Sequence, residues 1–329
     1  MQPTTVWHCA PAQATADEPP AGGVPDRTPA GHSRAPTLEA TPARRSIDLS
    51  ARRIDLHTHS TASDGTTLPG QLVVQARDAG LDVVALTDHD TTAGVDAASA
   101  ALPAGLTLVP GAEISCVSDG ISLHLLAYLF DRDEPVFAGA RRALRESRRS
   151  RAERIVASLA GTGVTWEQVA NLAAGTVGRP HIAQALVERG LVPTVTDAFT
   201  PEWIGTGGRH WAGKLELDVA DAVRMVAAAG GVSVFAHPGA AARGRTVPDE
   251  VYADLAAIGL AGLEVEHVDH DDRTRAHLRG LAGELGLLVT GSSDFHGGNK
   301  AVALGECTTD EAAYEQLVDR ASSAPVLTA

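Results

Sequence analysis

The chain has 329 residues, 44% of them hydrophobic, which is enough for a large domain with its own core. Its formal net charge of −14 disfavours binding to an extended nucleic-acid duplex, and no apolar run reaches the roughly 18 residues of a membrane span. The cysteines, Cys9, Cys116 and Cys307, offer neither a paired disulfide framework nor a zinc-binding CxxC motif. These properties predict a cytoplasmic globular protein with no membrane partner.

Residues 1–46 form a segment rich in Ala, Pro, Thr and Gly that lacks apolar periodicity, and we expect a disordered leader there. From Ile54 onward, short apolar runs alternate with helical stretches, which is typical of β/α units. The expected strands cover residues 53–56, 82–87, 107–110 with an extension toward 114, 122–129, 232–236, 262–268 and 287–290.

Helices are expected between most of these strands, at residues 68–79, 218–229 and 273–285. Each is followed at once by a glycine, the residue that most easily ends a helix in the left-handed conformation. Further along the chain the β/α alternation lapses, and helical stretches at 134–161, 165–172 and 180–189 predict an insertion. The folded part is therefore divided into a first section at 47–130, a helical insertion at 131–217 and a second section at 218–329.

The first expected strand ends in the sequence Asp55-Leu56-His57-Thr58-His59. Because side chains alternate between the two faces of a strand, both imidazoles point the same way and can bind one ion. A single pair of this kind also occurs at polar strand ends that bind nothing. Its interpretation therefore depends on which other residues accompany it.

Further imidazole and acidic side chains occur where other expected strands end, and parallel sheets place their active sites at that edge. Any one of them could cap a helix or face solvent. Together they would repel one another or titrate near neutrality unless cations bind between them. Imidazoles and carboxylates without thiolates suit zinc, manganese or iron(II). The candidates are His89 after the second strand, Glu113 after the third, His237 after the fifth, Asp294 and His296 after the last, and Asp64 in the loop after the first pair.

These residues lie in short motifs at 57–65, 87–90, 111–115, 236–239 and 293–297, with His124 in an apolar strand and the motif 178–181 in the insertion. Their order resembles that of PHP (polymerase and histidinol phosphatase) domain phosphoesterases. The resemblance covers about residues 53–310. It is closest to the subgroup that contains nucleotide 3',5'-bisphosphate phosphatases and 5'-to-3' exoribonucleases acting on short RNA.

The resemblance implies a distorted (β/α)7 barrel, similar to a TIM barrel, with a helical insertion and two or three divalent metal ions. Asp88 is then expected to accept a hydrogen bond from a ligand imidazole and so to orient it. The implied ligands are His57, His59, Glu113 and Asp294 for a first metal, Glu113, His124 and His237 for a second, and Asp64, His89 and His296 for a third.

The resemblance also implies a reaction. A hydroxide that bridges the first two metals would be the nucleophile, because metal ions lower the pKa of bound water, and no side-chain nucleophile is required. Arg179, with Arg151 or Arg148, and His181 are the candidates for binding the substrate phosphate. The arginine-rich stretch 141–154 is equally compatible with a solvated helix face, and His181 with a packed residue at a helix start.

The expected function is hydrolysis of phosphate esters on a nucleotide or a short 5'-phosphorylated oligonucleotide. The arginines of the insertion favour it, because a nucleotide enzyme needs a second phosphate site. The alternatives are a phosphatase of a small metabolite such as histidinol phosphate, a noncatalytic PHP scaffold and an amidohydrolase acting on a C–N bond. The filled ligand positions disfavour a scaffold, and the placement of Lys214 and Lys300 outside the expected strands disfavours an amidohydrolase with a carbamylated lysine. The pattern predicts no particular oligomeric state. His267 and His270, after the sixth strand, could line the pocket.

Overall fold

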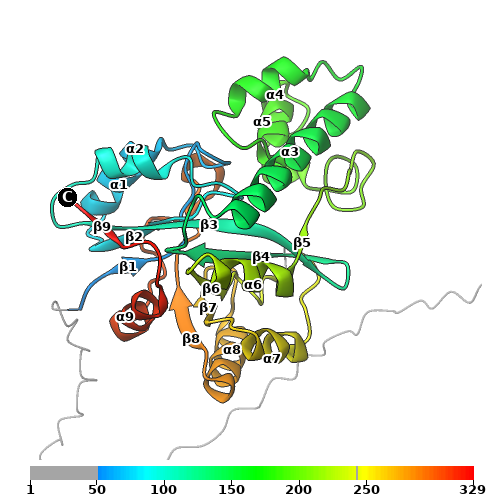
Figure 1. The fold of residues 1–329 in the computed structure, drawn as a ribbon. Coiled ribbons are helices and arrows are strands. Elements are labelled where there is room, and N and C mark those ends of the chain that lie inside the picture. Colours follow the sequence, from blue (N-terminus) through cyan, green and yellow to red (C-terminus); the bar gives the residue numbers. More distant parts are fainter. Residues whose placement is uncertain (1–50, 242–243) are drawn as a thin grey trace, which may run out of the picture. The chain divides into compact units, whose positions relative to one another are not determined.

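The computed structural model describes residues 51–241 and 244–329 (Figure 1), and the predicted leader at 1–46 lies outside the described residues. The strands are β1 (Ile54–Asp55), β2 (Val83–Leu86), β3 (Thr107–Ser118), β4 (Ile121–Tyr128), β5 (Leu217–Asp218), β6 (Val232–Phe235), β7 (Gly262–Glu266), β8 (Leu288–Gly291) and β9 (Leu327–Thr328). The helices are α1 (Pro69–Asp78), α2 (Val95–Ala100), α3 (Pro135–Ser158), α4 (Trp166–Leu172), α5 (Arg179–Glu188), α6 (Val219–Ala228), α7 (Asp249–Ala257), α8 (Asp272–Leu285) and α9 (Glu311–Arg320), with 3₁₀ turns at Thr196–Ala198 and Gly297–Asn299.

The strands form one sheet in the order β1-β2-β3-β4-β6-β7-β8, and β5 and β9 pair with β3 away from that path. The neighbours β1, β2 and β3 pair in parallel, as do β6, β7 and β8, but β4 is antiparallel to both β3 and β6. β3 and β4, between which no helix was expected, form a hairpin. Asp119 and Gly120, with φ of 46° and 72°, form its two-residue turn, and this conformation matches the twist of paired strands.

Contacts between the chain segments after β1 and β8 nearly close the sheet into a barrel. Thr58 pairs with Phe295 in an isolated parallel bridge, and the His59 N–H donates to the Phe295 carbonyl over 2.8 Å. The buried carboxylate of Asp55 accepts hydrogen bonds from the backbone N–H and the hydroxyl of Ser293. The two ends of the strand order therefore meet at the edge where the motifs lie.

The barrel is held by apolar layers on both faces of the sheet. On the inner face, strand residues such as Ile54, Val83 and Val234 pack with Leu317 of α9. On the outer face, alternate strand residues pack against α6, α7 and α8 in one layer and against α1 and α2 in another. Because side chains alternate along a strand, residues between the outward-facing ones point into the barrel.

Between β4 and β6 the helices α3, α4 and α5 pack around a separate apolar cluster that includes Ile155, Val169, Leu186 and Ile204 (Figure 1). They correspond to the helices predicted at 134–161, 165–172 and 180–189. We propose residues 131–217 as the insertion on the basis of this separate core.

The helix ends follow the sequence signals. Gly80, Gly230 and Gly286, which come after α1, α6 and α8, have φ of 78°, 71° and 66°. Asp218 and Asp271 cap the N-termini of α6 and α8 with their carboxylates. Within the described ranges, no helix is both long and apolar enough to cross a membrane.

Candidate metal and phosphate site

Imidazole and carboxylate side chains converge at one edge of the barrel, where β1, β2, β6 and β8 end and where β3 pairs with β4. Ion-pair distances of 2.7 to 3.8 Å connect all the predicted metal-site residues into one network. All are buried except His124 and His237, which are half-buried. The set comprises His57, His59, Asp64, His89, Glu113, His124, His237, Asp294 and His296.

Glu113 lies at the centre of this network. The sequence prediction placed it after the third strand, but β3 continues to Ser118, so Glu113 lies within it. Its neighbours Ala112 and Ile114 pack on the outer face, so its carboxylate points inward. Its Oε1 is 2.7 Å from His124 Nδ1 and 3.0 Å from His237 Nε2, and its Oε2 is 3.4 Å from His57 Nε2, 3.2 Å from His59 Nε2 and 3.0 Å from His89 Nδ1.

A second group of contacts forms around Asp64, in the loop after β1. One carboxylate oxygen lies 3.4 Å from His296 Nε2, and the other lies 3.5 Å from His89 Nε2. The rings of His59 and His296 stack with centroids 4.0 Å apart. The ligand atoms of His59, Asp64, His89 and His296 all lie within 4.8 Å of one another, close enough to share one ion.

Asp294, after β8, joins this network to Lys300 and to His267, which the sequence analysis named only as a residue that could line the pocket. Its Oδ1 lies 3.5 Å from His57 Nε2 and 3.4 Å from His59 Nε2. Its Oδ2 lies 2.5 Å from Lys300 Nζ and 3.5 Å from His267 Nε2. Of the two, Lys300 had been given no role at all.

The protonation of these imidazoles depends on their neighbours. Burial opposes the charged form of His57, but the surrounding carboxylates, Asp294 first, raise its pKa well above the usual value. His59 has a pKa of about 9, because hydrogen bonds to Asp294 and Glu113 outweigh its burial. Burial lowers the pKa of His89 to about 3. Adjacent rings are thus driven toward opposite protonation states.

The arrangement of donor atoms fits divalent cations. The buried Nδ1 atoms of His89 and His124 make no hydrogen bond to any described residue, although a Glu113 oxygen lies 3.0 and 2.7 Å away, respectively. The Nε2 atoms of His57 and His59 lie 3.0 Å apart. Lone pairs at such distances repel unless a proton or a cation lies between them. Imidazole nitrogens and carboxylate oxygens are also the ligands that zinc, manganese and iron accept.

Glu264, in the middle of β7, was missed by the sequence reasoning. Its carboxylate accepts hydrogen bonds from the backbone N–H of His237 and the hydroxyl of Ser292, and its Oε1 lies 3.0 Å from His57 Nδ1. The available signal was the alternation in β7, because the outward-facing Leu263 and Val265 flank it. Glu264 therefore contacts the His57 imidazole in the way that the resemblance implied for Asp88.

Asp88 has a different set of partners from the one expected. Its carboxylate accepts hydrogen bonds from the backbone and hydroxyl of Ser60 and from the hydroxyl of Ser63. The Ser63 hydroxyl in turn lies 3.4 Å from His59 Nδ1. Asp88 thus holds the loop after β1 and reaches an imidazole only through Ser63.

The backbone at the site is locally strained. Asp90, His237 and Asp294 have φ of 57°, 31° and 54°, in the left-handed region that residues with a Cβ rarely adopt. Each such residue costs roughly 1 to 2 kcal/mol. Packing and hydrogen bonding around them must supply that energy, which is common at functional sites.

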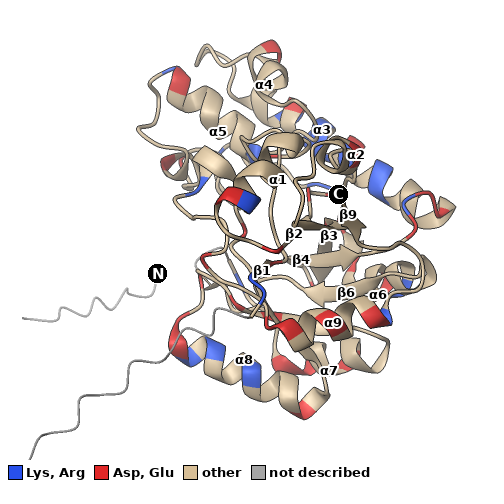
Figure 2. Cartoon of the chain, turned by 90° about the vertical axis from the view of Figure 1, so that its left-hand side faces the viewer, with Lys and Arg blue, Asp and Glu red and all other residues tan. Residues whose placement is uncertain are grey.

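A cluster of positively charged side chains lies beside the carboxylates. Figure 2 shows Lys and Arg along α3, and the buried face of that helix carries Arg148 and Arg151. Arg148 donates to Asp90 Oδ2 over 2.6 Å and to the Ser115 hydroxyl over 2.7 Å. These contacts occupy the guanidinium of one of the predicted phosphate-binding residues.

Arg151, Arg179 and Lys214 form the rest of this cluster. Burial, together with repulsion from neighbouring cations, lowers their pKa values to about 9, 10 and 8, respectively. The buried Nε of Arg151 makes no hydrogen bond within the described part of the chain. Arg179 donates to the Ile204 carbonyl and Lys214 to the Glu216 carboxylate, and the remaining donors of this cluster are available to an anion. The sequence reasoning gave Lys214 no role, because nothing local marks an extended segment as folding back onto α3.

The N-terminus of α5 lies between the two clusters. A Cβ atom at Gly178 would lie 3.7 Å from an Asp64 oxygen and 3.9 Å from an Arg148 nitrogen. His181, the last of the predicted phosphate residues, accepts a hydrogen bond from the Gly178 N–H through Nδ1. Its Nε2 therefore carries the proton in the neutral ring and is a hydrogen-bond donor.

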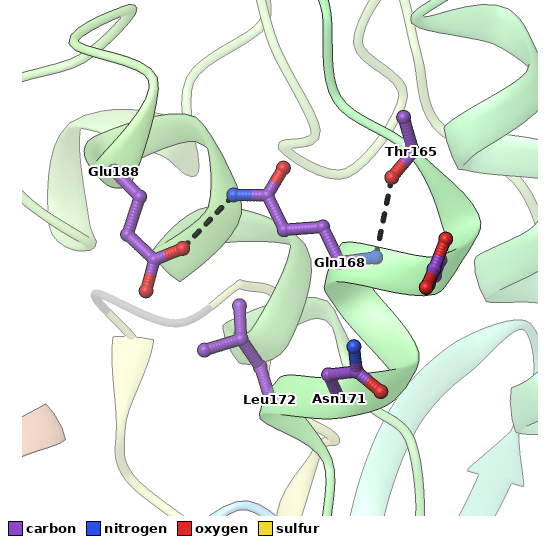
Figure 3. Close-up of a pocket in the computed structure, with 6 residues that line it drawn as sticks. Thr165, Gln168, Asn171, Leu172 and Glu188 are labelled. Atoms are coloured by element: carbon purple, nitrogen blue, oxygen red, sulfur yellow. Dashed lines mark hydrogen bonds between the residues drawn. The ribbon is translucent and has the colours of Figure 1, made fainter.

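A surface pocket elsewhere on the molecule does not suit an anionic substrate (Figure 3). It lies on α4 and α5, and acidic Glu167 and Glu188 contribute to its lining. Gln168 donates a hydrogen bond to Glu188 over 2.9 Å. The histidine and arginine clusters lie outside this pocket, so the chemistry belongs to the barrel edge.

The chain belongs to the PHP family. A PHP domain model matches residues 55–158, which include most of the network around Glu113. As a member of this family, the chain is a metal-dependent phosphoesterase with a distorted TIM-like barrel. The enzyme class and the fold that the motifs predicted are therefore confirmed.

Two curated relatives and one solved structure are similar to most of the chain. The chain is 33% identical over 258 residues to a 3',5'-nucleoside bisphosphate phosphatase of Chromobacterium violaceum, covering 74% of this chain and 87% of the relative. It is 34% identical over 248 residues to a 5'-3' exoribonuclease of Haemophilus influenzae, covering 74% and 90%. A solved structure from Bifidobacterium adolescentis, described as a metal-dependent phosphoesterase, matches with a TM-score of 0.79 and 37% identity over 83% of this chain and 98% of that one.

Proposed function

We propose that this protein hydrolyses a phosphate ester of a nucleotide or of a short 5'-phosphorylated oligonucleotide. The observation that carries this proposal is the cluster of Arg151, Arg179 and Lys214 beside the network of imidazoles and carboxylates. The cluster offers a site for one phosphate while another lies at the metal ligands. The relatives named as a bisphosphate phosphatase and an exoribonuclease support substrates with more than one phosphate.

The metal centre in this proposal holds two or three divalent ions, manganese, zinc or iron. When bound, these ions lower the pKa of an attacking water and neutralise charge on the phosphoryl oxygens. The side chains that would hold them are the nine of the network: His57, His59, Asp64, His89, Glu113, His124, His237, Asp294 and His296.

The remaining residues position these ligands and the substrate. Glu264 fixes the ring of His57 through Nδ1 and leaves Nε2 facing the centre. Arg148 holds Asp90, and through it the chain beside His89, while Arg151 and Arg179 bind the phosphate that is not cleaved. His181 Nε2 supplies a further donor to that phosphate.

Hydrolysis of adenosine 3',5'-bisphosphate, a 5'-phosphorylated RNA and histidinol phosphate, measured side by side with added metals, tests this proposal. We expect turnover of the nucleotide substrates that is lost in His57→Ala, because His57 contacts both Glu113 and Asp294. Replacement of the exposed His277 on α8 by Ala is the matched control and should leave turnover unchanged.

The products distinguish the candidates. Removal of a 3'-phosphate alone identifies a phosphatase, and stepwise shortening of RNA identifies an exoribonuclease. Turnover of histidinol phosphate alone would favour a small-metabolite phosphatase instead. No turnover of any of the three substrates by protein with bound metal would contradict the proposed substrate class.

A further inference from the structure

An aromatic side chain without a role in the site described above, Phe199, lies directly beside the arginine cluster. The guanidinium carbon of Arg179 lies over its ring, 5.3 Å from the centroid. Phe199 is 37% exposed. Two of the other exposed large apolar side chains in the described part, Trp211 and Leu215, lie in the same segment, 199–215.

The segment that carries Phe199 is held in place by its neighbours. Ile204 is fully buried in the apolar core of the insertion, and its N–H donates to Ala198, just before Phe199. A Cβ at Gly205 would lie 2.6 Å from the carbonyl oxygen of Thr200, so this turn is packed as tightly as a glycine allows. The exposure of Phe199 therefore belongs to a well-packed turn.

Phe199 contacts a residue at the N-terminus of α5, the helix end that lies beside Asp64. The ring contacts Arg179, whose Nη1 also donates to the Ile204 carbonyl over 3.3 Å. Arg179 follows Gly178, where a Cβ atom would lie 3.7 Å from a carboxylate oxygen of Asp64. The guanidinium of Arg179 therefore contacts the Phe199 ring, and its backbone adjoins the glycine that lies beside the Asp64 carboxylate.

We propose that Phe199 stacks on the nucleobase of the substrate while Arg179 binds its phosphate, so that the base is part of what the enzyme recognises. This inference rests on the proposed function and deepens it. The guanidinium covers one face of the ring, and the exposed remainder is available to a base. Stacking of a base on an aromatic side chain requires no particular base edge, so the site accepts different bases.

Binding of adenosine 5'-monophosphate and ribose 5-phosphate to the full-length protein, measured by calorimetry, isolates this contact. Both ligands carry the same phosphate, so a change at Arg179 alters both affinities equally. The ratio of the two affinities therefore measures the contribution of the base. We expect wild type to prefer the nucleotide by about 5- to 100-fold, and Phe199→Ala to reduce the ratio to about 1. Phe199→Trp should retain the preference, and Phe199→Leu, which keeps apolar volume without an aromatic face, should lose most of it.

Replacement of Val74, which is 43% exposed on α1, by Ala is the control for truncation of an exposed apolar side chain. An affinity ratio that stays the same in Phe199→Ala, or that is close to 1 in wild type, would overturn the proposal. Because binding is measured without turnover, a protein that cleaves no nucleotide but still prefers it through Phe199 would refute the proposed function and support the stacking contact.

Discussion

Glu264 is the single residue on which the geometry of His57 most depends. Its carboxylate contacts His57 Nδ1, the His237 backbone and the Ser292 hydroxyl at once. We predict that Glu264→Gln lowers metal affinity roughly 10- to 100-fold, because an uncharged partner makes the imidazole a weaker and less oriented ligand. Titration of the metal-free protein against a competing chelator measures this change.

Glu266, two residues further along the same strand, provides the matched control. Its carboxylate faces Arg275 and Arg279 near the surface, so Glu266→Gln should leave metal affinity unchanged. Equal metal affinities for wild type and Glu264→Gln would show that the carboxylate only packs against His57.

At the scale of single residues, the sequence predicts those whose position depends on neighbours close in the chain. His57 and His59 lie two residues apart just after β1, so their shared direction can be inferred from spacing alone. Glu264 depends on a partner that is distant in the chain, since 207 residues separate it from His57. Asp88 lies beside the predicted ligands, but its serine partners could not be inferred from spacing.

The connection between the insertion and the barrel is an element-scale feature. The Thr176 N–H donates to the Ala62 carbonyl, in the loop that carries Asp64. A Cβ at Gly175 would overlap that carbonyl group. We predict that Gly175→Ala displaces the loop, costs about 1 to 3 kcal/mol of stability through overpacking and weakens metal binding. Urea unfolding and metal titration measure the two effects.

Gly139 offers a contrasting position in α3, where an added Cβ meets only the end of the Arg142 side chain, at 4.0 Å. Gly139→Ala should be neutral or stabilising by up to about 1 kcal/mol, because alanine favours helix. If Gly139→Ala and Gly175→Ala changed stability and metal binding equally, steric contact with Ala62 would not be the cause of the losses in Gly175→Ala.

Most strands and six of the helices were predicted from the sequence, but α2, α7 and α9 were not. Periodicity locates β3 and β4 but does not say how they pair, so the sequence analysis left their direction open. The Asp119-Gly120 pair was the signal for a hairpin, since these residue types adopt positive φ readily. Glu113 was placed after the third strand, whereas β3 continues through it to Ser118.

At the scale of the whole molecule, the metal centre joins loops and strands from every part of the barrel. We predict that removal of metal lowers the unfolding temperature by roughly 5 to 10 °C. An ion present at 100 times its dissociation constant stabilises the folded state by about 2.7 kcal/mol, and each kcal/mol shifts the midpoint by about 2 to 4 °C in a domain of this size. Calorimetry with and without chelator measures the shift.

His57→Ala provides the internal comparison for this measurement, because it removes a proposed ligand without altering the outer apolar layers. Its midpoint should respond less to chelator than that of wild type. An unchanged midpoint for wild type from which the metal has demonstrably been removed would mean that the centre contributes nothing to folding stability.

The contact between Thr58 and Phe295 has a consequence for how the enzyme matures during synthesis. The strand order that begins with β1 is completed only by β8, so His57 and His59 leave the ribosome long before Asp294 and His296 exist. On the proposed ligand set, the site is therefore completed only after β8 has been translated. A chain cut short before β8 lacks the two proposed ligands that follow that strand.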